Sequence, residues 1–418
     1  MAEAPAMQPV MRRRFLLIAL LAVPFGLYGW ALVVATGAGY NGKIGPAFNG
    51  LACDWTIFYT AIRAWRQASL GHIYDQVWFG RMMAGAYKPW LVSPEPFPAF
   101  HYPPTWLLFL APLSGLSMIA SYAVGQIASL AALVVALMRT FKARAQYIFA
   151  ATSLLLAPAT SNNVLSGQNG LLICALFAAG LPLLESQPIL AGAILGVASF
   201  KPQMLLMLPF ALWGARNWRA LGGAAASATG LAILSALVFG LGPWRDWIGL
   251  MLHPRHDVAF TGVDWGRLWD DSVFTCAQLL GLSKTGANLC QMAATLGAAA
   301  CVFAAYRRPL PVDRRMVVFL AASVVGAPHV SPYDLVALAL AATILAWNSL
   351  NGDYRLGALV VPFAAWLAPL YGPPRATPTG LLIPVVAFAV VAVAMMGDEA
   401  MAAGNWRAEP GRLSQRTD

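Results

Sequence analysis

Apolar residues fill most of this chain in long stretches that are separated by short polar turns. A helix that crosses a bilayer needs about 20 predominantly apolar residues. Shorter or proline-broken stretches are tolerated where neighbouring helices satisfy the freed backbone groups. The pattern therefore predicts an all-α, polytopic membrane bundle with about 12 spanning helices, at 15–36, 118–138, 146–161, 168–184, 188–200, 202–214, 218–241, 285–306, 314–328, 332–349, 355–371 and 378–396.

One further apolar segment, 103–116, does not fit a simple crossing. Counting it as a span would invert every later loop and place basic loops on both sides of the membrane, against the positive-inside rule. We therefore expect this segment to be a re-entrant or interfacial piece ahead of the 118–138 helix.

Two longer polar segments, 38–102 and 242–283, interrupt the apolar pattern. Within the first, 55–69 repeats apolar residues at helical spacing, which predicts an amphipathic helix that lies on the membrane surface and is stopped by Gly71. A second such helix is expected at 75–87, whereas the proline-rich 89–104 predicts no regular structure. The apolar face of the first helix consists of Trp55, Phe58, Tyr59, Ile62 and Trp65.

Composition agrees with a membrane protein. Of the 418 residues, 59% are apolar and 11% are charged, whereas soluble domains carry roughly 25% charged residues. No segment between the apolar stretches is long enough for a separate aqueous domain, so we expect one membrane domain over 1–400 and a tail at 401–418.

The net charge of +10 is explained by membrane topology and does not indicate nucleic acid as a partner, because the basic residues sit in short clusters beside apolar runs. These clusters predict cytoplasmic turns and cytoplasmic termini, with the two long loops on the periplasmic side of a bacterial inner membrane. The clusters are Arg12 to Arg14; Arg139, Lys142 and Arg144; Arg216 and Arg219; Arg307, Arg308, Arg314 and Arg315; Arg355; and Arg407, Arg412 and Arg416.

Motifs of soluble chemistry are absent. The sequence has no phosphate-binding glycine loop, no dinucleotide fingerprint, no zinc-protease motif and no nucleophile elbow. Its five cysteines form no C-x-x-C pair, and a Cys53–Cys276 disulfide stays open as an alternative. The spacing of His253, His256 and Asp257 resembles metal ligands, but nothing completes a site, so no metal or cofactor is expected.

Asp54 is the first candidate for chemistry, because it lies just outside the first predicted span and opens the amphipathic helix. Two interpretations apply to it: an N-cap that accepts amide hydrogen bonds, or a carboxylate that accepts a proton from a sugar hydroxyl. Further along, Tyr102 precedes two prolines that stiffen the chain where it re-enters the bilayer.

Three further polar motifs follow at predicted outward turns. Gln168 and Asn169 open an apolar helix. Their side chains either cap this helix or form hydrogen bonds with a polar headgroup. Lys201 stands between two short apolar segments, where it either snorkels to the interface or pairs with a phosphate. The last motif places an imidazole and a carboxylate on one turn, at His329, Tyr333 and Asp334. Polar residues of the second loop (Arg245, Asp246, His253, Arg255, His256, Asp257, Asp264, Arg267, Asp270 and Asp271) are expected to be solvated or paired at the surface.

The order of these polar motifs along the chain resembles glycosyltransferase family 87, a family of GT-C membrane enzymes. The resemblance covers roughly 50 to 340 and rests on several short motifs. They are Asp54-Trp55 with Tyr59; Gly71-His72-Ile73-Tyr74-Asp75; Tyr102-Pro103-Pro104 with Ala111-Pro112-Leu113; Gly167-Gln168-Asn169; Ala191-Gly192 before Lys201-Pro202; Asn217-Trp218-Arg219; and Ser331-Pro332-Tyr333-Asp334.

The resemblance implies a polyprenyl-phosphate-linked sugar donor, mannose or a pentose as the sugar, and a glycan or glycolipid acceptor. An essential acidic residue in the first outward loop of the family maps onto Asp54 as general base. Lys201, with His329 or a loop arginine, would then stabilise the departing phosphate. Some members carry a His-His pair after the Ser-Pro element, where this chain has Tyr333-Asp334 with His329 just before it.

Two other functions stay open at this point. A secondary transporter of a small solute predicts ionisable residues at the bilayer midplane and paired broken helices in two halves. A different lipid-linked transferase, such as an O-antigen ligase, predicts its main functional loop late in the chain, whereas the informative loop here comes first.

Overall fold

The computed structural model describes residues 9–38, 51–87, 100–252, 270–351, 356–372 and 377–396, and within these ranges the chain is helical without any strand. The α helices are α1 (Pro9–Ala38), α2 (Cys53–Arg66), α3 (Gln76–Tyr87), α4 (Thr105–Leu110), α5 (Met118–Thr140), α6 (Arg144–Leu156), α7 (Pro158–Ser166), α8 (Gly170–Gly180), α9 (Pro188–Val197), α10 (Leu208–Gly214), α11 (Trp218–Phe239), α12 (Gly242–Leu252), α13 (Val273–Leu279), α14 (Lys284–Arg307), α15 (Val312–Gly326), α16 (Val336–Asn351), α17 (Val360–Leu367) and α18 (Leu382–Met395).

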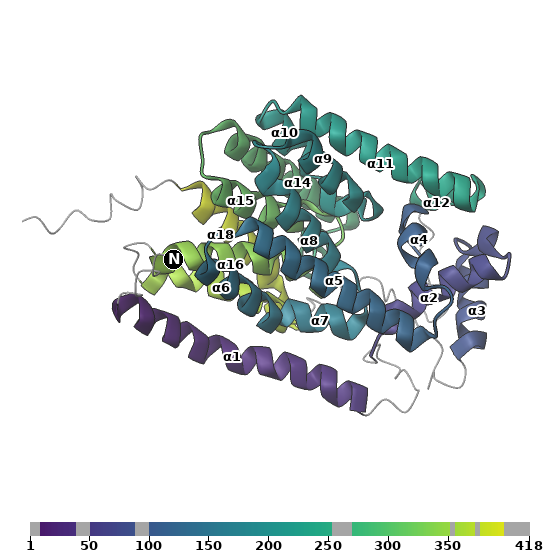
Figure 1. Cartoon of the computed structure of the whole chain (residues 1–418), viewed down its shortest axis with the longest axis horizontal. Coiled ribbons are helices and arrows are strands. Elements are labelled where there is room, and N and C mark those ends of the chain that lie inside the picture. The colour runs from purple at the N-terminus through teal and green to yellow at the C-terminus, as the bar shows by residue number, and fades with distance from the viewer. Residues whose placement is uncertain are drawn as a thin grey trace, which may run out of the picture.

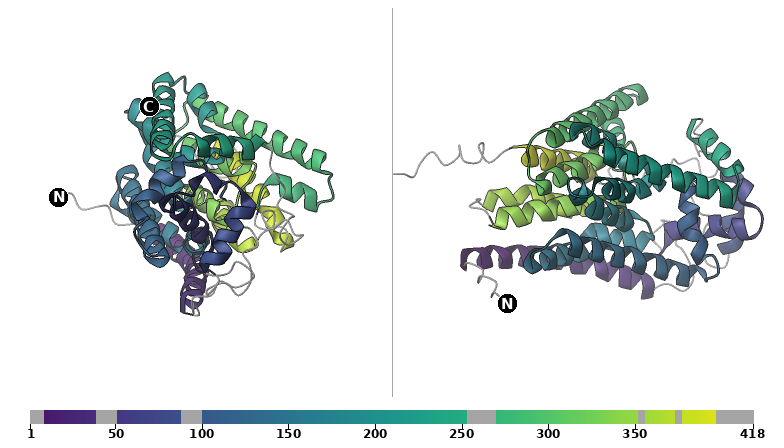
Figure 2. Two further views of the ribbon diagram at one scale, coloured as in Figure 1. Left: turned by 90° about the vertical axis from the view of Figure 1, so that its right-hand side faces the viewer. Right: turned by 45° about the horizontal axis from the view of Figure 1, so that its top comes forward.

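Short 3-10 helices extend or connect several of these. They are η1 (Leu70–His72), η2 (Ala111–Leu113), η3 (Leu181–Leu183), η4 (Ala198–Phe200), η5 (Pro202–Leu205), η7 (Pro332–Leu335), η8 (Leu356–Leu359), η9 (Ala368–Tyr371) and η10 (Pro378–Leu381). The long helices form one bundle, α1 runs along its outside, and α2, α3, α4 and α12 gather at one end (Figure 1). Figure 2 shows the same arrangement from two further directions.

Every predicted spanning segment coincides with one helix or a run of consecutive helices, but the count of twelve crossings is not established. Within the described residues, five helical segments are long and apolar enough to cross a membrane, and a sixth is the pair α6–α7, bent by 53°. Pro158 at the start of α7 causes that bend because it cannot continue the backbone ladder of α6. The Leu155 carbonyl accepts a hydrogen bond from the Trp30 indole instead, at 2.7 Å.

Burial separates a protein-facing core from a lipid-facing rim. Helices α15 and α16 form the core, and every residue from Met316 to Gly326 is buried. The outer helices expose large aliphatic side chains, such as Leu237 on α11 at 78% and Ile127 on α5 at 66%. Apolar surface of this extent is stable against lipid and not against water, so the chain is a membrane protein.

The first long loop is more deeply packed than the sequence suggested. Helix α2 begins at Cys53, and Trp55, Phe58 and Ile62 are at most 4% exposed. The predicted membrane-facing side is therefore buried against protein, where the Trp55 indole donates to Ser121 at 2.9 Å. The helix ends at Arg66, before Gly71, and Ala68 adopts a φ of 54°.

Other loop predictions have mixed outcomes. The second helix of this loop is present as α3, whereas most of the proline-rich segment lies outside the described residues. Residues 103–116 form only α4 and η2, which are too short to cross a bilayer as a separate helix; the re-entrant assignment stays a prediction. The second long loop contains α12 and α13, and its middle, 253–269, is outside the described residues.

Helices α9 and α11 touch backbone to backbone, and this contact holds the segment that leads to Lys201. A Cβ on Gly192 would overlap the carbonyl oxygen of Ala220, and one on Gly196 would overlap that of Ala224. Small residues at such crossings allow the close approach from which membrane helices gain packing energy.

We predict that Gly192→Ala lowers the stability of the folded protein by about 1–3 kcal/mol, because the added methyl overpacks this crossing. The matched control is Gly222→Ala on α11, where a Cβ meets nothing within 4 Å and the helix gains about 0.5–1 kcal/mol. Unfolding midpoints of both variants in detergent check this. Equal midpoints for the two would show that the crossing tolerates a larger separation.

Candidate active site

Asp54 lies in the first turn of α2 and does not cap it. The N-cap position belongs to Ala52, which has a left-handed φ of 64° and provides no side-chain cap. The Asp54 carboxylate instead accepts a hydrogen bond from Gln168 Nε2 at 3.0 Å, and Cys53 Sγ lies 3.8 Å away. The capping interpretation is therefore wrong, although the helix dipole still favours an anion here.

Tyr102, Gln168 and Asn169 connect Asp54 to the interior of the bundle. The Tyr102 hydroxyl lies 2.9 Å from Gln168 Oε1 and 3.4 Å from Asn169 Oδ1. The Tyr102 ring packs edge-on against Phe58 of α2, with centroids 5.1 Å apart. Neither amide side chain caps α8, so the capping alternative for Gln168 and Asn169 is wrong and both amides face the network.

Buried amides hold the turn that presents these two side chains. Asn163 Nδ2 and Gln126 Nε2 both donate to the Gln168 carbonyl, at 3.0 and 3.1 Å. Gly167 ends α7 with a φ of 78°, and a Cβ there would approach Trp55 Cβ at 2.8 Å. The turn therefore requires glycine both for its backbone conformation and for the close approach of α2.

Lys201 is buried and ion-paired. Pro202 ends the preceding helical stretch at Lys201, whose side chain turns inward and is 2% exposed. Its ammonium group forms an ion pair with Asp334 and donates to Asn169 Oδ1 at 3.2 Å. Snorkelling is thus the wrong interpretation, and the charge of Lys201 is already matched by a carboxylate.

Tyr333 and Asp334 come from the junction of α15 and α16. The Lys201 ammonium lies 4.9 Å from the centre of the Tyr333 ring, a cation–π distance. Asp334 Oδ2 accepts from the Ser331 amide at 3.2 Å. A Cβ on Gly170 would overlap the Tyr333 carbonyl oxygen, which shows how tightly the start of α8 is pressed against this turn.

Asp270 and His329 form a second charged pair, in addition to that of Lys201 and Asp334. The sequence did not indicate Asp270 as a partner of His329. His329 Nδ1 lies 3.5 Å from Asp270 Oδ1. The Asp270 carboxylate also accepts hydrogen bonds from Ser272, Thr275 and the Val330 amide. Asp270 is 5% exposed, whereas the His329 side chain is 48% exposed, so the imidazole is the accessible member of the pair.

Asp271 is buried, and neither of its carboxylate oxygens has a hydrogen-bond partner among the described residues. Its backbone amide donates to the Val330 carbonyl at 2.7 Å, which docks the end of the second loop onto the His329 turn. The expectation of a solvated surface was wrong for Asp270 and Asp271, and only the run of polar residues before α13 hinted at a structured turn. Arg245 and Asp246 do pair at the surface, at 3.2 Å.

Burial shifts the protonation of the groups at this end of the bundle. Desolvation raises the pKa of Asp54 to about 6, although the hydrogen bond from Gln168 and the charge of Lys201 oppose that shift. Burial and the neighbouring carboxylates of Asp270 and Asp334 raise the pKa of Asp271 well above its usual range. Desolvation lowers the pKa of His329, but the charge and hydrogen bond of Asp270 together with the charge of Asp334 raise it, and the net shift is upward.

The structure therefore connects most of the sequence candidates. Asp54, Tyr102, Gln168, Asn169, Lys201, Tyr333 and Asp334 form one set of contacts, and His329 joins it through Ser331 at 3.4 Å. Cys53 and Cys276 do not form a disulfide with each other. Among the described residues no cluster suits a metal ion; His253, His256 and Asp257 lie outside them.

Comparison with known families identifies the class of protein. The model of glycosyltransferase family 87 matches residues 100–332, more than half of the chain. No curated protein and no solved structure matches the chain.

The chain belongs to glycosyltransferase family 87, and it is a membrane glycosyltransferase. Five of the candidate residues, from Tyr102 to His329, lie inside the matched stretch. Tyr333 and Asp334 follow its end directly, and Asp54 precedes its beginning.

We predict that Lys201→Met destabilises the protein by about 3–5 kcal/mol, because it leaves the Asp334 carboxylate buried without its cation. The double variant Lys201→Met/Asp334→Leu removes both charges and should recover most of that loss. Unfolding midpoints in detergent measure both effects. A single variant as stable as the unaltered protein would mean that the ion pair does not support the fold.

Proposed function

We propose that this enzyme transfers a sugar, a hexose such as mannose or a pentose, from a polyprenyl phosphate to an envelope glycan or glycolipid. The reaction takes place at the periplasmic face of a bacterial inner membrane. The observation that carries the proposal is the contact of Asp54 with a network that contains buried cationic and amide donors, at one end of a membrane bundle.

Asp54 has the properties of a general base. A base works best when its pKa lies near the working pH, and burial moves the pKa of this carboxyl to about 6. The other carboxylates of the network are engaged elsewhere: Asp334 is paired with Lys201 and Asp270 with His329. Among the described residues, no cation contacts Asp54 or Asp271 directly, and of these two carboxylates only that of Asp54 is hydrogen-bonded into the network.

The leaving phosphate needs donors and positive charge. His329 provides an accessible cation, since Asp270 favours its protonated form. Lys201, whose charge is matched by Asp334, holds Asn169 by a hydrogen bond. Among the described residues the buried Asn169 Nδ2 group has no hydrogen-bond partner, so it is a donor for a phosphate or sugar oxygen.

These groups support a single displacement. The acceptor hydroxyl gives its proton to Asp54, its oxygen forms a bond to the anomeric carbon, and the bond from that carbon to the phosphate oxygen breaks. The electron pair leaves with the polyprenyl phosphate, whose charge His329 and Asn169 stabilise. One carboxylate base without a carboxylate nucleophile supports inversion at the anomeric carbon.

The distribution of charge supports the orientation. Basic turns at the far end of α8 lie close together: Thr140 donates to the Ala178 carbonyl, Asn217 to Leu184, and Arg315 pairs with Glu185. The Asp54 network lies at the start of α8. By the positive-inside rule, this distribution supports a cytoplasmic position for the basic end and an outward position for the network.

The same distribution favours an enzyme over a transporter. Within the described residues, the fully buried charged side chains are Lys201, Asp270, Asp271 and Asp334, and all four lie at the network end. A transporter places its ionisable groups at the midplane between two repeats. An enzyme whose substrates meet at one membrane surface needs no ionisable groups at the midplane.

We predict that Asp54→Asn lowers transfer by about 10²- to 10⁴-fold, because the amide cannot accept the acceptor's proton. The matched control is Asp75→Asn in the same loop, whose side chain accepts amide hydrogen bonds at the start of α3; asparagine keeps that cap. Transfer from a polyprenyl-phosphate sugar in vesicles is the assay. Near-normal activity of Asp54→Asn would exclude it as the base.

Transfer should also fall as the pH drops through about 6, because the base must be ionised and the pKa of Asp54 is raised to that value. Gln168→Leu removes a hydrogen bond that lowers this pKa, so its acidic limb should move to higher pH. Rate–pH profiles of the two proteins test this. An unmoved limb would mean that another group controls it.

A further inference from the structure

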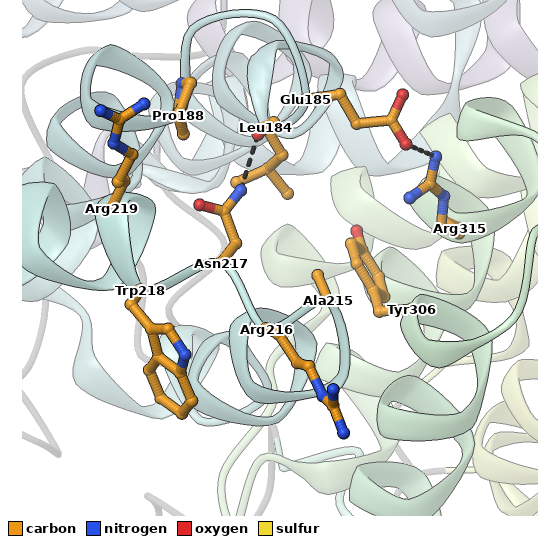
Figure 3. Close-up of a pocket in the computed structure, with 10 residues that line it drawn as sticks. All are labelled: Leu184, Glu185, Pro188, Ala215, Arg216, Asn217, Trp218, Arg219, Tyr306 and Arg315. Carbon is orange, nitrogen blue, oxygen red and sulfur yellow. Dashed lines mark hydrogen bonds and ion pairs between the residues drawn. The ribbon is translucent and has the colours of Figure 1, made fainter.

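A cavity of about 430 Å³ opens at the end of the bundle that lies opposite the Asp54 network. Figure 3 shows the side chains around it, which come from the turn after η3, the start of α9, the α10–α11 turn, the end of α14 and the start of α15. The polar and aromatic residues of the lining include Glu185, Arg216, Asn217, Trp218, Tyr306 and Arg315.

The cavity is separate from the candidate active site. The network touches the start of α8, Lys201 just after α9 and η4, and the turn after α15, whereas the cavity touches the turn after η3, the start of α9 and the start of α15. Helix α15 spans 15 residues, so about 20 Å separate the two places at 1.5 Å per residue.

Hydrogen-bond donors predominate in this cavity. Tyr306 is 6% exposed, and its hydroxyl has no hydrogen-bond partner among the described residues. Arg315 Nε is likewise buried without a partner, while its terminal nitrogen pairs with Glu185. Arg216 is exposed and forms no ion pair within the described part of the chain. The one acidic residue of the lining, Glu185, is already neutralised, so the free groups favour an anion.

The backbone adds to this preference. Helix α9 begins at Pro188 and α11 at Trp218, both in the lining, and helix N-termini attract anions. Asn217 caps α11 by accepting from the Ala220 amide at 3.1 Å and donates to the Leu184 carbonyl at 2.6 Å. The rim of the cavity is therefore held rigidly from two sides.

Apolar side chains beside the cavity indicate that its ligand carries acyl chains. Trp218 is 60% exposed and Trp213 is 57% exposed, as is typical of tryptophan at the headgroup level of a bilayer. On the neighbouring helix, Ile189 is 60% exposed and Leu190 is 48% exposed. A free anion would gain nothing from this surface, whereas the tails of a lipid would cover it.

We propose that this cavity binds the phosphate group of an anionic phospholipid from the cytoplasmic leaflet. Arg216 and Arg315 contact the phosphate oxygens, the Tyr306 hydroxyl donates to one of them, and the acyl chains lie along α9 and α11. Basic pockets between membrane helices are suited to such headgroups. Lipid binding here is independent of the transfer chemistry, so either proposal can fail without the other.

The test uses the full chain in a zwitterionic detergent, with dioctanoyl phosphatidylglycerol as probe and native mass spectrometry as readout. Arg216 follows the C-cap of α10 in a left-handed conformation with a φ of 51°, so Arg216→Gly removes the charge and relieves backbone strain. Tyr306→Phe removes only the hydroxyl. We expect one saturable lipid, bound about tenfold more weakly by each variant. The control, Arg308→Gln, removes an exposed charge that is not part of the lining and should change nothing.

The proposal is overturned by the absence of saturable binding, by equal binding of dioctanoyl phosphatidylcholine, or by equal weakening by Arg308→Gln, which would indicate diffuse attraction of charge. Inorganic phosphate is then added as a competitor of the bound lipid. If phosphate alone displaces the lipid at similar concentration, the ligand is a free anion and the lipid assignment is wrong. Displacement only at far higher concentration supports the lipid.

Discussion

The buried ion pair between Lys201 and Asp334 is the interaction on which the rest of this structure depends. Two charges inside an apolar bundle are stable only when each satisfies the other and their remaining bonds are made. Asn169 and the Ser331 amide complete those bonds. The pair thereby fixes the start of α8, the end of η4 and the start of α16 relative to one another, and the network to Asp54 is built on that fixed point.

Tight backbone contacts hold the neighbouring helices in place around this ion pair. The crossing of α9 and α11 holds the segment that delivers Lys201, and the glycines at 167 and 170 let α2 and η7 approach the same turn. The two ends of α8 consequently differ in character. One end gathers carboxylates, amides and an imidazole, and the other gathers arginines, as expected when one end faces each side of a membrane.

Much of this arrangement is visible in the sequence. Hydropathy located the helices, since a helical span is a local property, and the polar turns marked Asp54, Gln168, Lys201 and Asp334. The local sequence pattern could not show which segments pack against each other when they lie far apart in the chain. The burial of α2, the pairing of Lys201 with a residue 133 positions later, and the contact of Asp270 with His329 all depend on tertiary packing.

The most direct test of the central claim follows the fate of a labelled sugar. Purified protein in sealed vesicles is given a polyprenyl phosphate that carries radiolabelled mannose, together with an acceptor glycolipid on the same face. The account predicts label on the acceptor and an equal amount of polyprenyl phosphate released, with inverted anomeric configuration. Label that crosses the membrane as free sugar, with no acceptor modified, would contradict it and indicate a transporter.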